Sequence, residues 1–281
     1  PERSRQLCKR IAAALRPGEH ALASLAQSGQ TGAMIVLFTD FGLTGPYIGQ
    51  VKAVLWREAP AVPVIDLFAD APAGKPKPAA YLLAAYAAWF PPGSVMLAVI
   101  DPGVGGARAA LVVEADGRWY VGPDNGLFEL VRRRAAHPRL WEITWRPERL
   151  SASFHGRDLF APVAARLARG EPPPGRLLPA DWGRCPEWPD DLPEIVYIDH
   201  FGNAMTGLRA GLVEEGAQLL AGGRLLARAA TFSKVGEGEA FWYENANGLA
   251  EIAVNAGRAA AVLALAIGSP VRIAAAAAGS R

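Results

Sequence analysis

Short apolar runs alternate with helical patterns along the chain from residue 34 onward. Residues 34–39 form a continuous apolar run, and residues 62–68 and 94–100 are mostly apolar, which is typical of strands buried on both faces. Between them, apolar side chains recur at helical spacing in residues 48–55, and residues 79–90 form an alanine- and leucine-rich helical pattern. Strands that alternate with helices predict an α/β domain with a mainly parallel central sheet covered on both faces.

The pattern changes after the third strand. Residues 110–114 and 119–121 predict a hairpin around the two-residue turn Asp116-Gly117, so we expect the sheet to be mixed. Helical patterns follow at residues 127–133 and 160–168.

Proline density marks the end of this domain. Seven prolines between residues 172 and 193 exclude a helix or a central strand and predict a semi-rigid linker. Beyond it, short strand patterns separated by glycine and asparagine turns predict a smaller β-barrel or β-sandwich. These patterns lie at residues 195–198, 218–220, 224–229, 251–254 and 271–273.

The chain is therefore expected to have four parts. Residues 34–170 form the α/β domain, residues 171–193 the proline-rich linker, and residues 194–281 the C-terminal β-barrel domain. Residues 1–33, in which five Lys or Arg flank a short Ala/Leu pattern, are expected to be a disordered or non-native extension. A targeting peptide is the less favoured alternative, because the segment lacks the apolar core of a secretion signal.

Composition narrows the class of protein. The 281 residues are 51% hydrophobic and 20% charged, a balance typical of a folded globular chain. The net charge of +2 gives no strong reason to expect a nucleic acid or an anionic membrane as partner. Cys8 and Cys185 lie far apart and outside metal-ligand spacing, so we expect a cytoplasmic protein without a zinc site. The apolar runs are far shorter than the roughly 20 residues that span a bilayer.

Acidic residues beside glycine follow three of the predicted strands. Asp40 ends the first strand, Asp101 the third, and Asp124 with Asn125 the hairpin. Taken singly, each is equally well explained as an ordinary turn, which Asp, Asn and Gly favour. Because a parallel sheet gathers the carboxyl ends of its strands at one edge, the set predicts a ligand crevice there.

His155 is the histidine best placed for chemistry. It lies in a Ser- and Gly-containing turn immediately before a helix, where unpaired backbone N–H groups can face an anion or an oxygen. A hydrogen-bonded structural histidine is the alternative.

Six blocks between residues 34 and 273 carry a resemblance to a known family. They are Thr39-Asp40-Phe41-Gly42, Asp101-Pro102-Gly103-Val104-Gly105, Pro123-Asp124-Asn125-Gly126, Phe154-His155-Gly156-Arg157-Asp158, Asp199-His200-Phe201-Gly202-Asn203 and Ile252-Ala253-Val254-Asn255. In order and approximate spacing the chain resembles the SAM hydroxide adenosyltransferases, the family related to the fluorinase and chlorinase enzymes. Six blocks in order are much more specific than any one of them.

The resemblance implies a two-domain homotrimer that binds S-adenosyl-L-methionine (SAM) between the α/β domain of one subunit and the β-barrel of its neighbour. It implies displacement at the ribose C5′ by water or hydroxide, which releases adenosine and L-methionine without a metal or other cofactor. The substrate-binding residues carried over by motif are Asp40, Phe154, Asp199, Phe201, Asn203, Asn247 and Asn255. Of these, Asp40 would bind the ribose hydroxyls, Phe201 and Asn203 the adenine, and Asp199 the methionine ammonium.

The resemblance also implies a catalytic Asp-Arg-His triad, whose positions are filled here by Asp101, Arg108 and His155. The halogenating relatives have Tyr in place of both the Asp and the His, which favours water as nucleophile. We expect Arg108 to stabilise developing hydroxide and His155, oriented by Asp101, to accept or hold its proton. Two alternatives stay open at this point: a halide-dependent SAM adenosyltransferase, and a non-catalytic protein that binds SAM or adenosine.

Two segments depart from the family pattern. Residues 71–76 replace a loop in which many relatives carry an acidic or aromatic residue, so the packing over the ribose is expected to differ. Ala246 and Asn247 stand where the halogenating members have Ser and Arg, which leaves the affinity for the amino-acid end undetermined.

Overall fold

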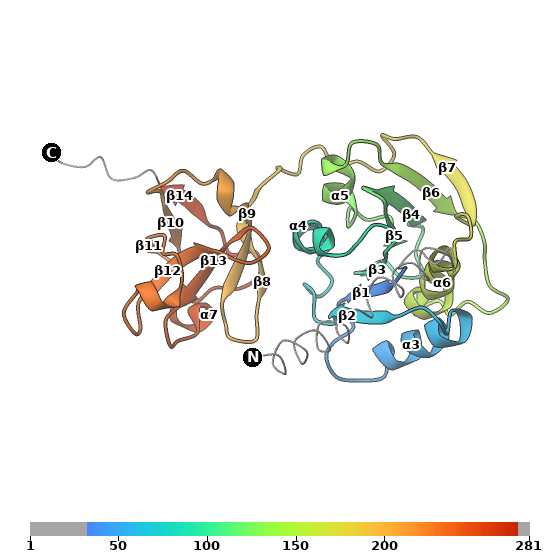
Figure 1. Cartoon of the computed structure of the whole chain (residues 1–281), viewed down its shortest axis with the longest axis horizontal. Helices are drawn as coiled ribbons and strands as arrows, with labels where there is room; N and C mark the ends of the chain where they lie inside the picture. Colours follow the sequence, from blue (N-terminus) through green and yellow to red (C-terminus); the bar gives the residue numbers. More distant parts are fainter. Residues whose placement is uncertain (1–32, 275–281) are drawn as a thin grey trace, which may run out of the picture.

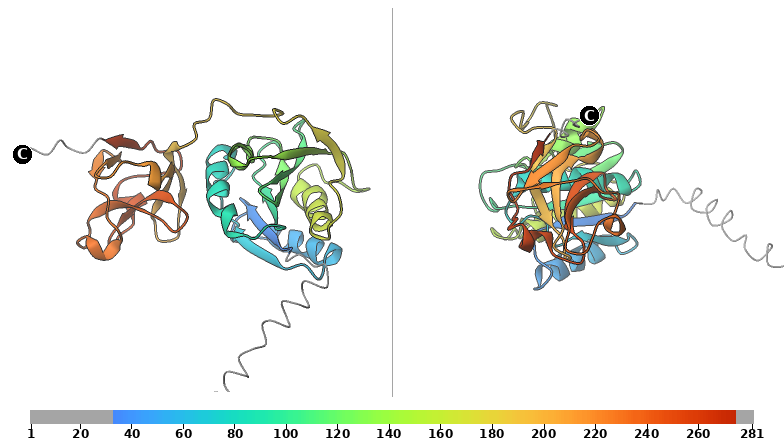
Figure 2. Two further views of the ribbon diagram at one scale, coloured as in Figure 1. Left: turned by 45° about the horizontal axis from the view of Figure 1, so that its top comes forward. Right: turned by 90° about the vertical axis from the view of Figure 1, so that its left-hand side faces the viewer.

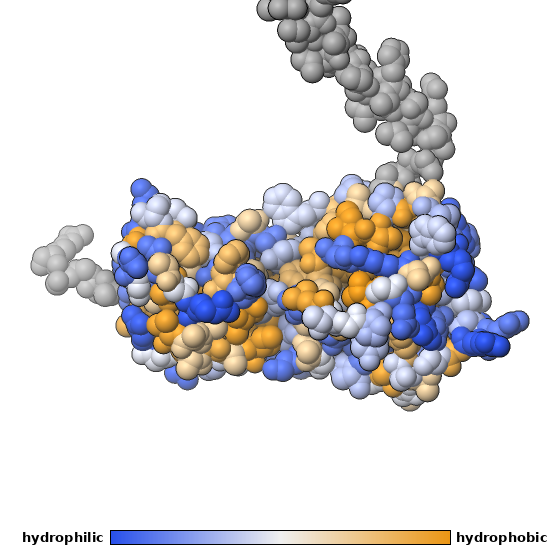
Figure 3. Space-filling model, turned by 90° about the horizontal axis from the view of Figure 1, so that it is seen from below, coloured by the Kyte–Doolittle hydropathy of each residue, from blue (hydrophilic) through white to orange (hydrophobic). Residues whose placement is uncertain are grey.

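The computed structural model describes residues 33–274, which build an N-terminal and a C-terminal domain joined by one extended segment (Figures 1 and 2). The extension expected at residues 1–33 lies outside the described part apart from its last residue. On the face drawn in Figure 3, hydrophobic side chains are exposed on both domains. Within the described residues, no helix is long and apolar enough to cross a bilayer.

The N-terminal domain is built on a seven-stranded mixed sheet in the order β2-β1-β3-β5-β4-β6-β7. Its strands are β1 (Ile35–Thr39), β2 (Val64–Phe68), β3 (Val95–Val99), β4 (Ala110–Ala115), β5 (Arg118–Pro123), β6 (Arg139–Ile143) and β7 (Gly175–Leu178). The first four strands in that order pair in parallel, and the remaining pairs are antiparallel. The predicted α/β class with a mixed sheet is therefore confirmed.

Helices cover both faces of this sheet. They are α3 (Tyr47–Glu58), α4 (Pro76–Tyr86), α5 (Glu129–Arg134) and α6 (Ala161–Ala168), with a 3-10 turn at Ala87–Trp89 and a π-helical turn at Gly156–Phe160. Strand β1 is buried along its whole length because its side chains alternate between two cores. Ile35 and Leu37 pack toward α3 and α6, whereas Val36 and Phe38 pack toward α4 and α5.

The C-terminal domain consists of two antiparallel sheets, as the barrel or sandwich prediction requires. One contains β12 (Ala240–Glu244), β13 (Leu249–Val254), β9 (Ala204–Arg209) and β8 (Leu192–Ile198), and the other β11 (Arg224–Leu226), β10 (Gln218–Ala221) and β14 (Arg272–Ala274). Short helical turns lie at Ala210–Leu212, Phe232–Lys234 and α7 (Ala259–Val262).

Strand β9 was not among the strands expected from sequence because Thr206 and Gly207 interrupt its apolar pattern. Gly207 is needed there, since a Cβ at this position would lie 2.6 Å from the Cβ of Leu192 on the neighbouring strand.

The proline-rich segment is attached to the N-terminal domain rather than suspended between the two. Its residues Gly175–Leu178 form β7, an edge strand, which tolerates neighbouring prolines better than a central strand does. The N-terminal sheet therefore extends beyond the expected end of the α/β domain at residue 170.

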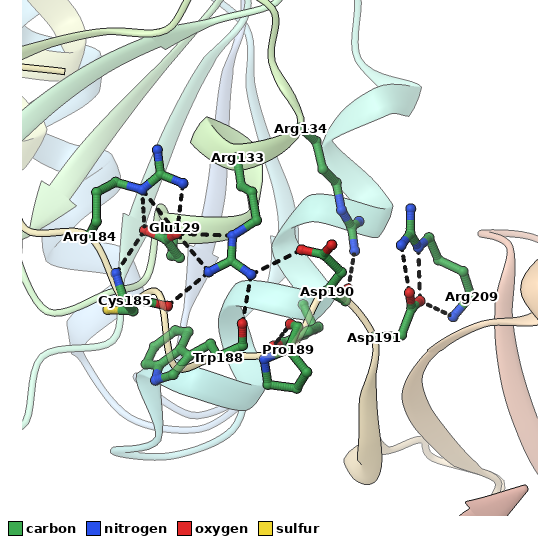
Figure 4. A network of polar contacts seen from close by, with 11 residues as sticks. Glu129, Arg133, Arg134, Arg184, Cys185, Trp188, Pro189, Asp190, Asp191 and Arg209 are labelled. Atoms are coloured by element: carbon green, nitrogen blue, oxygen red, sulfur yellow. Dashed lines mark hydrogen bonds and ion pairs between the residues drawn. The ribbon is translucent and has the colours of Figure 1, made fainter. Parts of the chain in front are cut away.

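The rest of the segment is held by a buried carboxylate on α5 (Figure 4). The side chain of Glu129 is fully buried and forms ion pairs with Arg133, at 2.8 Å, and Arg184, at 3.1 Å. Arg133 also donates to the backbone oxygens of Trp188 and Cys185. Arginines of α5 thereby donate hydrogen bonds to backbone carbonyls of a proline-rich segment that does not pair with a neighbouring strand.

The same contacts continue to the boundary between the domains. Asp190 pairs with Arg133 of α5, while the next residue, Asp191, pairs with Arg209 of β9. The two carboxylates are adjacent in sequence but are held by different domains.

We predict that Glu129→Gln destabilises the protein by about 3 kcal/mol, because it removes the buried charge that Arg133 and Arg184 share. Urea unfolding followed by circular dichroism measures the effect. The matched control is Glu114→Gln, which removes a surface pair with Arg139 and is expected to cost at most about 1 kcal/mol. Equal unfolding midpoints for the two variants would contradict the assigned role of Glu129.

Candidate active site

A cavity of about 140 Å³ lies at the carboxyl ends of β1 and β3, the edge at which the sequence predicts a crevice. Its lining residues are Asp40, Phe41, Gly74, Val99, Asp101, Pro102, Val104, Ser153, Phe154, His155 and Gly156. Two of the expected strand-end acids and the expected histidine are therefore brought together.

Two loops meet closely to form this cavity. Gly105 has φ +77°, and a Cβ there would lie 2.4 Å from the carbonyl oxygen of Ala152. Only glycine accommodates both the left-handed conformation and this approach. The contact brings the loop that carries Asp101 against the loop that carries His155.

Arg108 connects the other two members of the expected triad. Its guanidinium forms a bidentate ion pair with the carboxylate of Asp101, with 3.0 Å from Nε to Oδ1. The same guanidinium lies 2.9 Å from Nδ1 of His155. The side chains of Asp101 and Arg108 are only 6% and 11% exposed, so water screens this pair weakly. We expected Asp101 to orient His155; the hydrogen bonds instead run from Asp101 through Arg108 to the imidazole.

This geometry determines the protonation state of His155. A guanidinium has N–H donors and no acceptor, so Nδ1 must accept the hydrogen bond and the proton of the neutral ring lies on Nε2. Burial lowers the pKa of His155 below its usual 6.5, and the positive charge of Arg108 lowers it further, partly offset by Asp101. His155 is therefore neutral at pH 7, with Nε2–H as the group left to contact a ligand.

The rest of the Phe154–Asp158 block supports the loop that carries His155. Asp158 accepts the backbone N–H of Ser151 at 2.9 Å and pairs with Arg157. Arg157 stacks on the ring of Phe154 with its Cζ 5.1 Å from the ring centroid, and donates to Gln50 of α3. The π-helical turn that follows widens the helix start at this point, a distortion common at functional sites.

Asp40 lines the same cavity. Its Oδ2 accepts the backbone N–H of Gly74 at 2.8 Å, which ties the residue 71–76 loop to the end of β1. Burial raises the pKa of Asp40, while the Gly74 hydrogen bond opposes that shift. The loop that departs from the family pattern thus contributes a backbone donor to the site.

The third strand-end turn has a structural role instead of lining the cavity. Asp124 accepts the indole N–H of Trp182 at 2.8 Å, and Asn125 donates to the carbonyl of Ile100 at 2.8 Å. Asn125 thereby fixes the backbone immediately before Asp101.

A second, larger cavity of about 660 Å³ lies in the C-terminal domain. It is lined by Asp199, Phe201, Asn203, Phe232, Tyr243, Val254, Ala256, Gly257 and Arg258. Three of the expected substrate-binding residues are among them. In the described chain the two cavities share no lining residue.

Asp199 and Asn203 form a tight turn between β8 and β9. The backbone N–H of Asn203 donates to Oδ1 of Asp199 at 2.8 Å, and its side-chain Nδ2 donates to Oδ2 at 3.1 Å. Phe201, at the tip of this turn, is 71% exposed. Such an exposed ring beside a cavity offers a flat apolar surface for an aromatic ligand.

The other two expected residues of this domain do not line the cavity. Asn247 donates its backbone N–H to Asn245, and the side chain of Asn255 donates to the carbonyl of Val235 at 2.9 Å. The neighbours of Asn255, Val254 and Ala256, are the residues that reach the cavity.

Tyr243 and the buried Glu251 behind it were not identified from sequence. They face each other across β12 and β13, and the hydroxyl of Tyr243 donates to Oε1 of Glu251 at 2.5 Å. The signal in the sequence was a carboxylate in an otherwise apolar strand, since Glu251 is the charged residue of Leu249–Val254. Among residues 33–274, no group of three or more His, Cys, Asp or Glu side chains is arranged to hold a metal ion.

Comparisons with known proteins agree on one family. Residues 35–176 match the SAM hydroxide adenosyltransferase N-terminal domain, and residues 193–272 match the corresponding C-terminal domain. The (R)-S-adenosyl-L-methionine hydrolase of Thermus thermophilus is 43% identical over 259 residues, which are 85% of this chain and 98% of the relative. A protein of the same name from Salinispora arenicola is 37% identical over 250 residues, 84% of this chain and 95% of the relative.

A solved structure shares the fold. The crystal structure of an uncharacterized conserved protein from Thermotoga maritima superposes with a TM-score of 0.78 at 32% identity. The match covers 85% of this chain and 100% of that protein.

We predict that His155 titrates below pH 6.5 and that Arg108→Gln raises its pKa, because the substitution removes a nearby positive charge and leaves Asp101 in place. Histidine ring NMR across a pH series measures the pKa, with the signal assigned by its loss in His155→Ala. A pKa unchanged or lowered by Arg108→Gln would contradict the assigned contact.

Proposed function

The chain belongs to the SAM hydroxide adenosyltransferase family, and from this we propose that it is an (R)-S-adenosyl-L-methionine hydrolase that forms adenosine and L-methionine. The observation that carries the proposal is the connected Asp101-Arg108-His155 cluster in a cavity at the sheet edge. The hydrolase name of relatives that match most of the chain supports the same reaction.

The reaction balances without a further reactant. The oxygen of water forms a bond to the ribose C5′, the C5′–S bond breaks, and its electron pair stays on sulfur. The sulfonium becomes the neutral thioether of methionine, and the attacking oxygen loses one proton to the solvent. Since the sulfonium already carries the positive charge, the leaving group needs no protonation. What the protein must supply is a positioned and partly deprotonated water.

The triad meets that need through charge and orientation. Arg108 places a cation beside the imidazole, where it stabilises negative charge that develops on the water oxygen. Asp101 holds the guanidinium plane by two hydrogen bonds and offsets its charge. The Nε2–H of His155 donates to the water oxygen and orients it toward C5′.

The two cavities would hold different parts of SAM. The smaller one, with Asp40, Phe154 and the triad, takes the ribose and the reacting carbon. The larger one, with Asp199, Phe201 and Asn203, takes the adenine and the amino-acid end. The small cavity alone, at about 140 Å³, is too tight for a ligand of this size.

We propose that a second copy of the chain completes each site in a homotrimer. Exposed apolar side chains beside both cavities support this, among them Leu43 (77% exposed) and Phe201 (71% exposed). An exposed apolar surface next to a ligand cavity is typical of an interface that another chain covers.

A cytoplasmic location, expected from the separated cysteines, remains part of the proposal.

The test of hydrolysis is isotopic. Incubating the protein with SAM in H₂¹⁸O is expected to place the label in the 5′-hydroxyl of adenosine. Halide-dependent 5′-halo-adenosine instead of labelled adenosine would identify the halide adenosyltransferase alternative. Calorimetric SAM binding without any product over hours would identify the non-catalytic binding protein.

We predict that His155→Ala and Arg108→Ala each lower kcat by about 10²-fold or more, because the first removes the donor to the attacking water and the second removes the cation beside that donor. Steady-state assays of adenosine release measure this. His137→Ala, an exposed histidine on a loop, is the matched control and is expected to keep full activity. Wild-type rates in the two triad variants would overturn the triad assignment.

We further predict that two inactive variants restore activity when they assemble together. His155→Ala disables the small cavity and Asn203→Ala the large one. When the two variants assemble at random, about one quarter of all sites would combine two intact halves. Activity assays and size-exclusion chromatography of the co-expressed pair measure this. A co-assembled pair as inactive as its parents would show that both halves of a site come from one chain.

A further inference from the structure

We infer that Glu251, which does not line the large cavity, fixes the hydroxyl of Tyr243 as a hydrogen-bond acceptor and so makes one wall of that cavity selective for ligand N–H groups. Glu251 is a positioning residue in this assignment, and the inference rests on the proposed function of the cavity as the site for adenine and the amino-acid end of SAM.

The first step concerns the hydrogen bonds that the Glu251 carboxylate accepts. Its Oε2 accepts the side-chain amide of Asn245 at 2.8 Å. The amide of Asn245 cannot be turned round, because its Oδ1 already accepts the backbone N–H groups of Asn247 and Leu249 at 2.9 and 3.0 Å. Glu251 is 2% exposed and therefore has little water to exchange these partners for.

The second step is the hydroxyl of Tyr243. It donates to Oε1 of Glu251 at 2.5 Å, while Oε2 accepts the amide of Asn245, so both oxygens of the carboxylate act as acceptors. The hydroxyl hydrogen must therefore point to Glu251, which leaves only lone pairs of the phenolic oxygen for a ligand. Burial raises the pKa of Tyr243 and the hydrogen bond to Glu251 raises it further, so the hydroxyl keeps its proton.

The third step is Asn203, which shares the wall. Its Nδ2 donates to the carboxylate of Asp199 at 3.1 Å, so the amide nitrogen faces the protein and Oδ1 is the atom available to a ligand. Burial raises the pKa of Glu251, and hydrogen bonds from its polar neighbours, Asn203 among them, oppose that shift. Asp199 contributes a carboxylate to the same wall.

The wall made by Asp199, Asn203 and Tyr243 thus offers acceptors to a ligand. The charged donor of the cavity, Arg258, uses its Nη1 for a hydrogen bond to the carbonyl of His200 at 2.8 Å. SAM carries two groups rich in N–H donors, the 6-amino group of adenine and the α-ammonium of methionine. A carbonyl or an apolar group in either position would leave buried acceptors unpaired, which costs affinity.

Glu251→Gln tests the inference because glutamine has nearly the same shape as glutamate but carries an amide donor in place of one carboxylate oxygen. The fixed amide of Asn245 takes the oxygen of the introduced glutamine, so the glutamine N–H₂ faces the hydroxyl of Tyr243. Tyr243 must then accept a hydrogen bond from this amide and turn its own hydrogen toward the cavity. The cavity wall would gain a hydrogen-bond donor and lose its preference for ligand N–H groups.

The experiment measures calorimetric binding to the assembled protein for two ligand pairs. Adenosine against inosine probes the purine amino group, and L-methionine against 4-(methylthio)butanoate probes the ammonium. Glu239→Gln, an exposed carboxylate of the same domain, is the matched control. Because binding is measured without turnover, failure of SAM hydrolysis and failure of this inference give different results.

We expect wild type and Glu239→Gln to prefer the amino-bearing ligand of at least one pair by about tenfold or more. In Glu251→Gln that preference falls by about tenfold. Tyr243→Phe lowers it similarly, and the double variant lowers it no further, since both changes remove the same acceptor. Unchanged preferences in both pairs in a folded Glu251→Gln would overturn the inference. Equal weakening of all four ligands would also overturn it, because a merely structural role predicts that result.

Discussion

The bidentate pairing of Arg108 with Asp101 is the interaction on which the candidate active site depends. Burying either the guanidinium or the carboxylate here without its partner would cost considerable folding free energy, because both side chains are nearly inaccessible to water. Together they form a nearly neutral unit that still presents N–H groups in a fixed plane. One of these N–H groups faces Nδ1 of His155 and thereby determines the tautomer of its imidazole. Gly105 allows the two loops to approach closely enough for Arg108 to reach His155. The hydrogen bond from Ser151 to Asp158 supports the loop that carries His155.

Much of the fold was predictable because it follows from local patterns. Buried strands such as β1 and β3 are continuous apolar runs, and the acids that end them stand out against that background. Asp40 and Asp101 could therefore be assigned to one crevice before their distances were known. Asp124, assigned with them, has a structural role instead, and His155 was joined to Asp101 by the family resemblance. The strands β9 and β12 of the C-terminal domain were missed. Threonine and glycine break the apolar pattern of β9, and both strands are stabilised by neighbours distant in sequence.

The connections among charged groups were not predictable in the same way. Which of Asp101 and Arg108 reaches the imidazole depends on the reach of a long side chain across two loops, and the sequence does not encode that distance. Glu251 resembles an ordinary solvent-facing strand residue until Tyr243 and Asn245 are seen to enclose it. Likewise, the sequence of the proline-rich segment predicts a linker, whereas the structure shows that arginines of α5 bind its carbonyls.

The adjacent anchoring of Asp190 and Asp191 limits how the molecule can move. A hinge needs a few residues free to change their backbone angles, and here two adjacent residues of the connecting segment are held by ion pairs to different domains. Rigid-body opening of the two domains is thus restrained within each chain. In the proposed homotrimer, ligand entry and product escape would then proceed through local loop displacement or through separation of whole chains, so that the cohesion of the assembly, rather than opening within one chain, would determine exchange.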